Sequence, residues 1–153
     1  MTMATADELR AEIDALTAEI EASGHQDVKD LVDRRVALRA RLRRAEHRFR
    51  SYGAAHILDV EPDGDGWVVR LSGWTQDIRV PLTTKQTLLL ADAIGTRRSF
   101  TVVTGDAHVQ LEPAAEGAWA VRVADDTSSR SARLSADEAA ELATIITERN
   151  TVV

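Results

Sequence analysis

The residues best suited to chemistry in this sequence form a dense block of arginines in the first third of the chain. Residues 34–50 contain eight arginines against the single acid Glu46, a net charge of +7. A guanidinium group binds phosphates and carboxylates through paired hydrogen bonds, so the block suits a polyanionic partner. The candidate polyanion-binding residues are Arg34, Arg35, Arg39, Arg41, Arg43, Arg44 and Arg48.

The segment in front of this block carries the opposite charge. Residues 1–33 contain nine acids against two bases, a net charge of −7, and residues 51–153 have a net charge of −6. Segregation of charge on this scale leaves three uses for the arginines. They can pair with the acids of their own chain, with those of a second copy, or with a nucleic acid. We expect pairing within the chain, because an antiparallel turn would place the two segments side by side.

A second group of arginines lies within predicted strands. In the segments 67–71 and 78–82 apolar residues alternate with others, so the residues between them face solvent. Four arginines lie on this solvent face. They are Arg70 and Arg79 in these segments, and Arg122 and Arg133 in the similar strands predicted later in the chain. They can follow the backbone of a single-stranded nucleic acid. Acids share the face, however, and we expect cross-strand ion pairs.

Trp74 is the best single candidate for contact with a protein partner. It follows a predicted turn at Ser72-Gly73, whereas Trp67 and Trp119 occupy equivalent strand positions and are expected in the core. A tryptophan at a hairpin tip either folds over a neighbouring apolar cluster or anchors a partner. Both uses of Trp74 remain open.

The sequence holds no pattern typical of catalysis or of a metal site. The chain has no cysteine, which excludes disulfides, thiol chemistry and cysteine-ligated metals. Glycine-rich nucleotide-binding motifs and the hydrolase nucleophile motif are absent. His56 and His108 are 52 residues apart, but no histidine pair has the spacing of a zinc site. We predict that the protein is not an enzyme and holds no cofactor or metal.

An internal repeat organises the elements that carry these residues. Residues 67–94 align with residues 119–146 without a gap, with eight identities in 28 positions. Capping boxes, Thr83-x-x-Gln86 and Ser135-x-x-Glu138, mark the start of a helix in both copies. The Glu-Pro pairs at 61–62 and 112–113 align with an offset of 51, so the second copy has one extra residue before its tryptophan. A repeat of this kind outranks other signals of architecture.

Each repeat is predicted as three or four antiparallel strands followed by a helix. Repeat one covers residues 51–96 and repeat two residues 97–149. In repeat one the expected elements are strands 55–60, 67–71 and 78–82 and a helix over 83–94 that ends at Gly95. In repeat two they are strands 99–104, 107–111, 119–123 and 131–134 and a helix over 136–149. The two copies should share one core, because about 50 residues alone bury too little surface.

Residues 1–50 are predicted as a helical hairpin or coiled coil. An apolar seam with 4, 3, 4 spacing follows the capping box at Thr5, and a second helix is expected over residues 27–50 with a stripe that includes Phe49. Ser23-Gly24 suits a helix end, which favours an antiparallel hairpin. One continuous helix that tolerates Gly24 is the alternative. Such short seams are marginal alone, so we expect a homo-oligomer.

Four strands and a helix, repeated, also resemble the Pur-repeat and Whirly-like group of single-stranded nucleic-acid-binding proteins. The residues that carry the resemblance are the segments 56–60, 67–71 and 78–82 before the first helix, with 108–111, 119–123 and 132–134 before the second. The resemblance covers about residues 50–149. It implies a sheet face that binds single-stranded nucleic acid.

Taken together, the sequence predicts an α+β protein with residues 1–50 as one unit and residues 51–153 as a tandem repeat domain. The expected function is that of a non-enzymatic, oligomeric interaction or assembly protein that self-associates through its helices and presents the repeats to a protein partner. Binding of single-stranded nucleic acid through residues 34–50 and the sheet face is the alternative. No signal peptide or membrane-spanning run is evident, so we expect a cytoplasmic protein without membrane contact.

Overall fold

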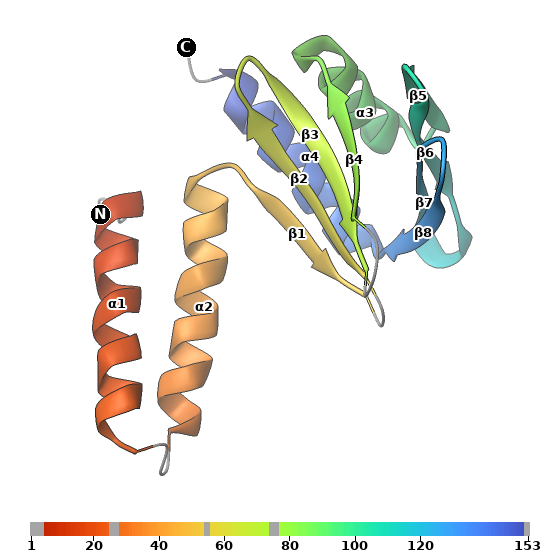
Figure 1. Cartoon of the computed structure of the whole chain (residues 1–153). Helices are drawn as coiled ribbons and strands as arrows, with labels where there is room; N and C mark the ends of the chain where they lie inside the picture. Colours follow the sequence, from red (N-terminus) through yellow and green to blue (C-terminus); the bar gives the residue numbers. More distant parts are fainter. Residues whose placement is uncertain (1–4, 25–27, 54–55, 74–76, 152–153) are drawn as a thin grey trace. The chain divides into compact units, whose positions relative to one another are not determined.

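The computed structural model describes residues 5–24, 28–53, 56–73 and 77–151. The chain divides into two compact units, Met1–Glu46 and His47–Val153. We call the first the helical hairpin and the second the repeat body (Figure 1). The fold is α+β, as predicted: two helices are followed by two four-stranded antiparallel sheets, each with its own helix.

The helical hairpin consists of α1 (Ala6–Ala22) and α2 (Lys29–Ala45). The Thr5 hydroxyl accepts a hydrogen bond from the Glu8 backbone N–H and caps the start of α1. Gly24 has a φ of +69°, which few other residues adopt, directly after the end of α1. The apolar seam residues pack together and are buried or partly buried; they are Leu9, Ile13, Leu16, Leu31, Leu38 and Leu42. The prediction of two packed helices rather than one continuous helix is therefore confirmed.

The second helix is shorter than the sequence predicted. It ends at Ala45, because His47 adopts a left-handed φ of 57° that no α-helix can contain. Phe49 was expected in the helical seam, but it lies in a strand and is buried in the core of the repeat body. A strand position there lets the aromatic ring join a much larger apolar cluster than the hairpin offers. Arg48 consequently lies outside α2.

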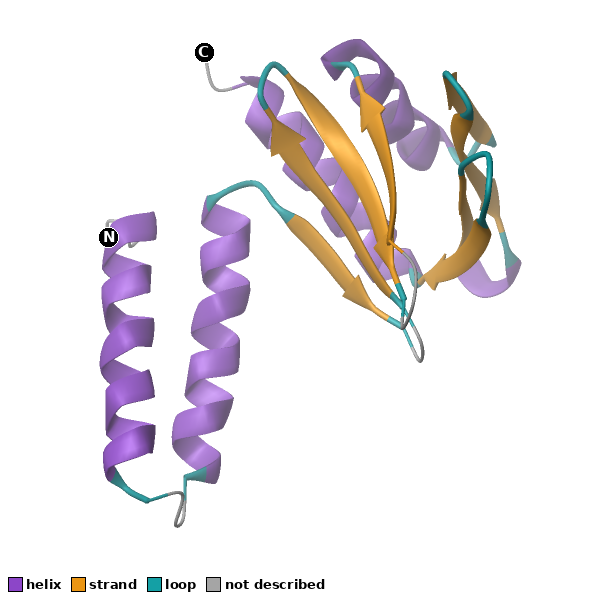
Figure 2. Cartoon of the chain, in the orientation of Figure 1, coloured by secondary structure: helices purple, strands orange, loops and turns teal. Residues whose placement is uncertain are grey.

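The repeat body contains two meander sheets, in which neighbouring strands in the sequence also pair in space (Figure 2). Sheet A has the order β1-β2-β3-β4, and sheet B has the order β5-β6-β7-β8. The strands of sheet A are β1 (Phe49–Tyr52), β2 (Ile57–Asp63), β3 (Gly66–Ser72) and β4 (Asp77–Leu82). The strands of sheet B are β5 (Phe100–Thr104), β6 (Ala107–Pro113), β7 (Trp119–Ala124) and β8 (Ser129–Leu134).

Two helices and both sheets share a single apolar core. Helix α3 (Thr84–Thr96) follows sheet A, and α4 (Ala136–Thr151) follows sheet B. The two helices pack on each other, and α4 also contacts β1 at the far end of the other sheet. One cluster joins the inward faces of both sheets to both helices and includes Trp67, Leu90, Trp119 and Leu142. This shared core explains why one repeat of this size would not be stable alone.

Strand register confirms the internal repeat and locates its one-residue insertion. Asp59 lies opposite Arg70 in sheet A, and Gln110 lies opposite Arg122 in sheet B. The first two strands are therefore related by 51 residues, and the last two by 52. The extra residue lies in the connection between β6 and β7, which contains a short 3-10 turn at Ala115–Gly117. His108 pairs with Ala124, whereas His56 precedes β2, so the two histidines are not equivalent.

Helix α3 does not stop at Gly95, contrary to the prediction. It continues to Thr96, and Arg97 takes the left-handed conformation, with φ 53° and ψ 51°, that ends it. This strained position places the Arg97 guanidinium 5.4 Å from the ring centroid of Trp119. The same side chain donates hydrogen bonds to the carbonyls of Ala114 and Gly117, at 2.7 and 3.3 Å. These contacts of Arg97 stabilise the helix end where glycine was expected to do so.

We expect Gly95→Ala to stabilise the protein by about 0.5–1 kcal/mol, because alanine loses less backbone entropy in a helix than glycine does. A Cβ at this position would meet nothing within 4 Å. Urea denaturation followed by circular dichroism measures the change. Gly66→Ala is the matched control: its Cβ would lie 2.5 Å from the Leu82 carbonyl oxygen, so the free energy of unfolding should fall. A loss of stability in Gly95→Ala would contradict the helical assignment.

Candidate interaction surfaces

The helical hairpin joins two helices of opposite charge. Helix α1 carries six acids and one arginine, a net charge of −5, and α2 carries seven basic residues and two acids, a net charge of +5. Arg10 bridges the helices through an ion pair of 2.8 Å with Glu46. Within the described residues, however, no ion pair joins an acid of α1 to Arg34, Arg39, Arg41 or Arg43. The pairing expected within the chain is thus not formed at these four positions.

Arg35 differs from the other arginines because it lies in the apolar seam. It occupies the position between Leu31 and Leu38 where a regular seam would place an apolar residue. Its Nη1 donates a hydrogen bond of 3.3 Å to the Thr17 hydroxyl, and its Nε is buried without a hydrogen-bond partner among the described residues. A partly satisfied polar group in a seam fixes the register of two helices at a cost in stability. Arg35 is therefore a structural residue of the hairpin.

One flank of the hairpin combines an exposed and a partly buried valine with both signs of charge. The Arg10–Glu46 ion pair marks this flank, and the residues that follow one another from these two at helical steps of three or four lie along it. On α2 the flank presents Val32, Val36, Arg39 and Arg43, and on α1 it presents Asp7, Asp14 and Glu21. Val36 is 58% exposed, although it is aliphatic. We call this surface the mixed flank.

The outer face of sheet A carries a row of charges that spans all four strands. Arg50, Asp59, Arg70 and Arg79 are direct cross-strand neighbours. Arg50 bonds to Asp59 at 2.6 Å, and Arg70 bonds to Asp77 at 2.9 Å. The hydrogen bond to Asp59 raises the pKa of Arg50, and the bond to Asp77 raises that of Arg70. Arg48 is likewise bonded to Glu61.

These ion pairs leave sheet A with little free positive charge. Three of the four sheet arginines, Arg79, Arg122 and Arg133, are exposed and have no ion-pair partner in the described part of the chain. Arg122 lies between Gln110 and Ser131 in sheet B, and Arg133 lies beside Ala120. The predicted sheet-face residues thus lie on two separate sheets, and the structure does not bring them into one cluster. Trp74 lies outside the described residues.

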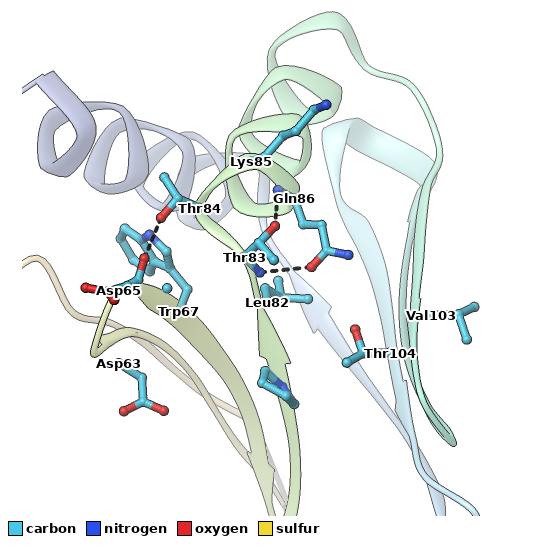
Figure 3. Close-up of a pocket in the computed structure, with 12 residues that line it drawn as sticks. Asp63, Asp65, Trp67, Leu82, Thr83, Thr84, Lys85, Gln86, Val103 and Thr104 are labelled. Atoms are coloured by element: carbon cyan, nitrogen blue, oxygen red, sulfur yellow. Dashed lines mark hydrogen bonds between the residues drawn. The ribbon is translucent and has the colours of Figure 1, made fainter.

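An open groove of about 690 Å³ lies at the start of α3 (Figure 3). The β2–β3 turn, the end of β4, the first turn of α3 and the end of β5 form its walls. The Thr83–Gln86 capping box caps the start of α3. The Thr84 hydroxyl donates a hydrogen bond of 2.9 Å to the Asp65 carbonyl. Acids from the turn and Val103 line the groove as well, and the Thr104 hydroxyl is buried without a partner among the described residues. Sequence patterns gave no sign of this groove, because its walls come from distant segments.

Glu138 connects the two repeats. Its carboxylate accepts hydrogen bonds from the Ser51 hydroxyl and from the Ser135 backbone N–H, the latter at 3.0 Å. Ser51 is buried on β1, so the bond joins α4 to sheet A. Partial burial alone would raise the pKa of Glu138, but the hydrogen bonds from Ser51 and Ser135 outweigh it and lower the pKa below its ordinary value.

We expect Glu138→Gln to reduce stability at neutral pH but not in acid. The folded-state pKa is lowered, so the carboxylate stabilises the fold above its unfolded pKa of about 4.3 and loses this effect as the pH falls through the folded value. Gln86, the equivalent residue of repeat one, retains its capping box without a charge, so the variant should keep its helix cap. Urea midpoints at pH 7 and pH 3 measure the difference. A difference from the wild type that is equal at both pH values would contradict the assigned role.

No known protein family, curated protein or solved structure matches this chain. Among the described residues no group of three histidine, aspartate or glutamate side chains could hold a metal ion. Nor does the described part of the chain contain a helix that is both long and apolar enough to cross a membrane.

Proposed function

We propose that this protein is a non-enzymatic assembly protein that self-associates through its helical hairpin and presents the repeat body to a protein partner. The observation that supports this function is the mixed flank, where acids on α1 and arginines on α2 lie without ion pairs to each other. Two hairpins related by a two-fold axis would place α1 of one against α2 of the other. In this two-fold interface the acids of α1 in each copy face the arginines of α2 in the other copy.

The spacing of the charges fits such a pairing. Asp7, Asp14 and Glu21 follow each other at intervals of seven along α1. Running in the opposite direction, Arg43 and Lys29 of the second copy span the same distance along α2 as Asp7 and Glu21 span along α1, and Arg39 lies within about one helical turn of the level of Asp14. Val36 would lie within the interface and lose its exposure to water, which contributes a non-ionic part to the association. The resulting four-helix arrangement also gives the short seam the additional packing that marginal helices need.

Light scattering after size-exclusion chromatography of the full chain tests this function. We expect an oligomer at low salt that dissociates in part at high salt, since salt screens ion pairs between exposed groups. A monomer at all salt concentrations, with protein at micromolar levels, would rule the proposal out.

Binding of single-stranded nucleic acid is the second candidate function. It is supported by the four arginines of α2 that form no ion pair with α1 among the described residues, and by the likeness to Pur-repeat and Whirly-like proteins in the order of strands and helices. Acids occupy the outer face of sheet A, so binding in this case would use the arginines of α2, with Arg39 and Arg43 on the mixed flank and Arg34 and Arg41 on the opposite flank of the helix. Adding a mixed-sequence oligonucleotide to the scattering experiment distinguishes the two functions. A complex that forms at low salt and dissolves at high salt would favour nucleic acid.

A further inference from the structure

The two sheets of the repeat body have four edge strands, and three of them are protected against pairing with another strand. Sheet edges are normally blunted by charged residues or proline, because unpaired backbone groups attract other strands. Strand β1 carries Arg50 and contacts α4, and β4 carries Arg79 and Pro81. Strand β8 carries two arginines within six residues. Strand β5, with the sequence Phe-Thr-Val-Val-Thr, has neither a charge nor a proline.

Strand β5 pairs with a neighbouring strand on one side only, which is that of β6. A two-residue loop, Gly105-Asp106, joins β5 to β6, so the flanking pair of Thr104 and Ala107 is hydrogen-bonded. Because bonded and non-bonded pairs alternate, the N–H and C=O groups of Thr101 and Val103 point away from β6. In the described residues no backbone hydrogen bond joins these groups to another element. The Val103 side chain is also 67% exposed, the largest exposed fraction among the large apolar residues that the structure describes in the repeat body.

We infer that β5 is a second self-association surface, which pairs antiparallel with β5 of another copy. A two-fold axis through Val102 would place Thr101 opposite Val103 of the second strand and Val102 opposite its own copy. Four backbone hydrogen bonds would form. Each of the two Thr101–Val103 pairs would bring two β-branched side chains together on the exposed face, and such side chains pack well between neighbouring strands. No like charges would meet, whereas self-pairing of β4 or β8 would bring arginines together. A second copy is therefore the partner that the chemistry of this strand fits best.

This surface is independent of the mixed flank and responds differently to salt. Association through β5 depends on backbone hydrogen bonds and apolar contact, so high salt should leave it intact. Association through the mixed flank weakens under the same conditions. A chain with both surfaces would form species larger than a dimer at low salt and a dimer through β5 at high salt.

Disulfide trapping in the full chain tests the proposed register. The chain has no cysteine of its own, so any covalent dimer must form through an introduced residue. In the paired strands Thr101 and Val103 of the second copy would have Cα atoms about 5.5 Å apart, within the range for a disulfide. Two copies of the same position would be separated by roughly 8–9 Å, which is beyond that range. We therefore expect a mixture of Thr101→Cys and Val103→Cys chains to form disulfide dimers under oxidising conditions, and each variant alone to form far fewer.

Val103→Lys provides the second measurement. It places like charges in the paired strands and should weaken the high-salt dimer roughly tenfold or more, whereas Val103→Thr should leave it unchanged. Both substitutions are at an exposed position, and circular dichroism confirms that the variants fold. Equal cross-linking in the mixture and in the separate variants, or a high-salt dimer that persists in Val103→Lys, would overturn the inference. Arg39→Glu, which affects the mixed flank, should not alter cross-linking at β5.

Discussion

Arg39→Glu is expected to weaken the self-association of the full chain by about 2 kcal/mol, or roughly 30-fold in Kd at low salt. The substitution replaces an attraction to Asp14 of the second copy with a repulsion, and two-fold symmetry makes this happen twice in each dimer. Arg39 is exposed and makes no ion pair within the described part of its own hairpin, so the fold of the hairpin should not change. Sedimentation equilibrium at low salt measures the effect.

A charge swap provides the decisive control for this prediction. Asp14→Arg alone should weaken association in the same way, and the double variant Asp14→Arg/Arg39→Glu should restore it. Recovery in the double variant identifies a direct pairing, because two independent losses would add. Arg34→Glu is the matched control: it reverses the same charge on the same helix but on the opposite flank, so it should leave association unchanged. A double variant no tighter than its single parents would show that the mixed flank is not the interface.

Trp119→Ala is expected to lower the free energy of unfolding of the repeat body by about 3–5 kcal/mol, the largest effect on stability among these predictions. The Trp119 side chain is only 2% exposed and belongs to the core that both sheets share. The Arg97 guanidinium also loses the ring over which it lies. Urea denaturation followed by circular dichroism measures the loss.

Trp67→Ala is the natural comparison, because Trp67 occupies the equivalent position of repeat one and is equally buried. Since one core serves both repeats, we expect either substitution to destabilise the whole repeat body and leave a single cooperative transition. Arg97→Ala should cost about 0.5–1 kcal/mol, as expected when a cation over an aromatic ring is lost. Separate transitions for the two repeats in either tryptophan variant would contradict the shared core.

Much of the fold could be predicted because local patterns determine it. Alternation of apolar residues indicated the strands at 67–71 and 119–123, and the capping boxes at Thr83 and Ser135 indicated where α3 and α4 begin. Strand β1 was missed because Phe49 continues the helical spacing of α2 by chance, and only contacts with the distant Val60 place it in a sheet. The end of α3 was predicted at Gly95 from residue type alone, whereas contacts of Arg97 with the β6–β7 connection permit a later end.

The candidate surfaces were less accessible to sequence reasoning. The arginine block was evident as a count of charges, but the different environments of its members depend on three-dimensional neighbours. Arg35 lies in the seam and Arg48 bonds to Glu61, whereas Arg39 forms no ion pair with α1 among the described residues. Strand β5 was predicted as a strand, yet its place at an unprotected edge follows only from the order of the strands in sheet B.

By itself, the sequence determined the α+β class, the tandem repeat, the hairpin and the opposite charges of its two helices, because each depends on periodicity or on charge along the chain. The tertiary structure decided which charges pair, which strand edges are open and how far each helix extends. These properties depend on residues that are distant in the sequence. Ser51 and Glu138, 87 positions apart, illustrate the distinction: no local pattern relates a serine on β1 to a capping glutamate on α4, and only the packing of one repeat on the other brings them into contact.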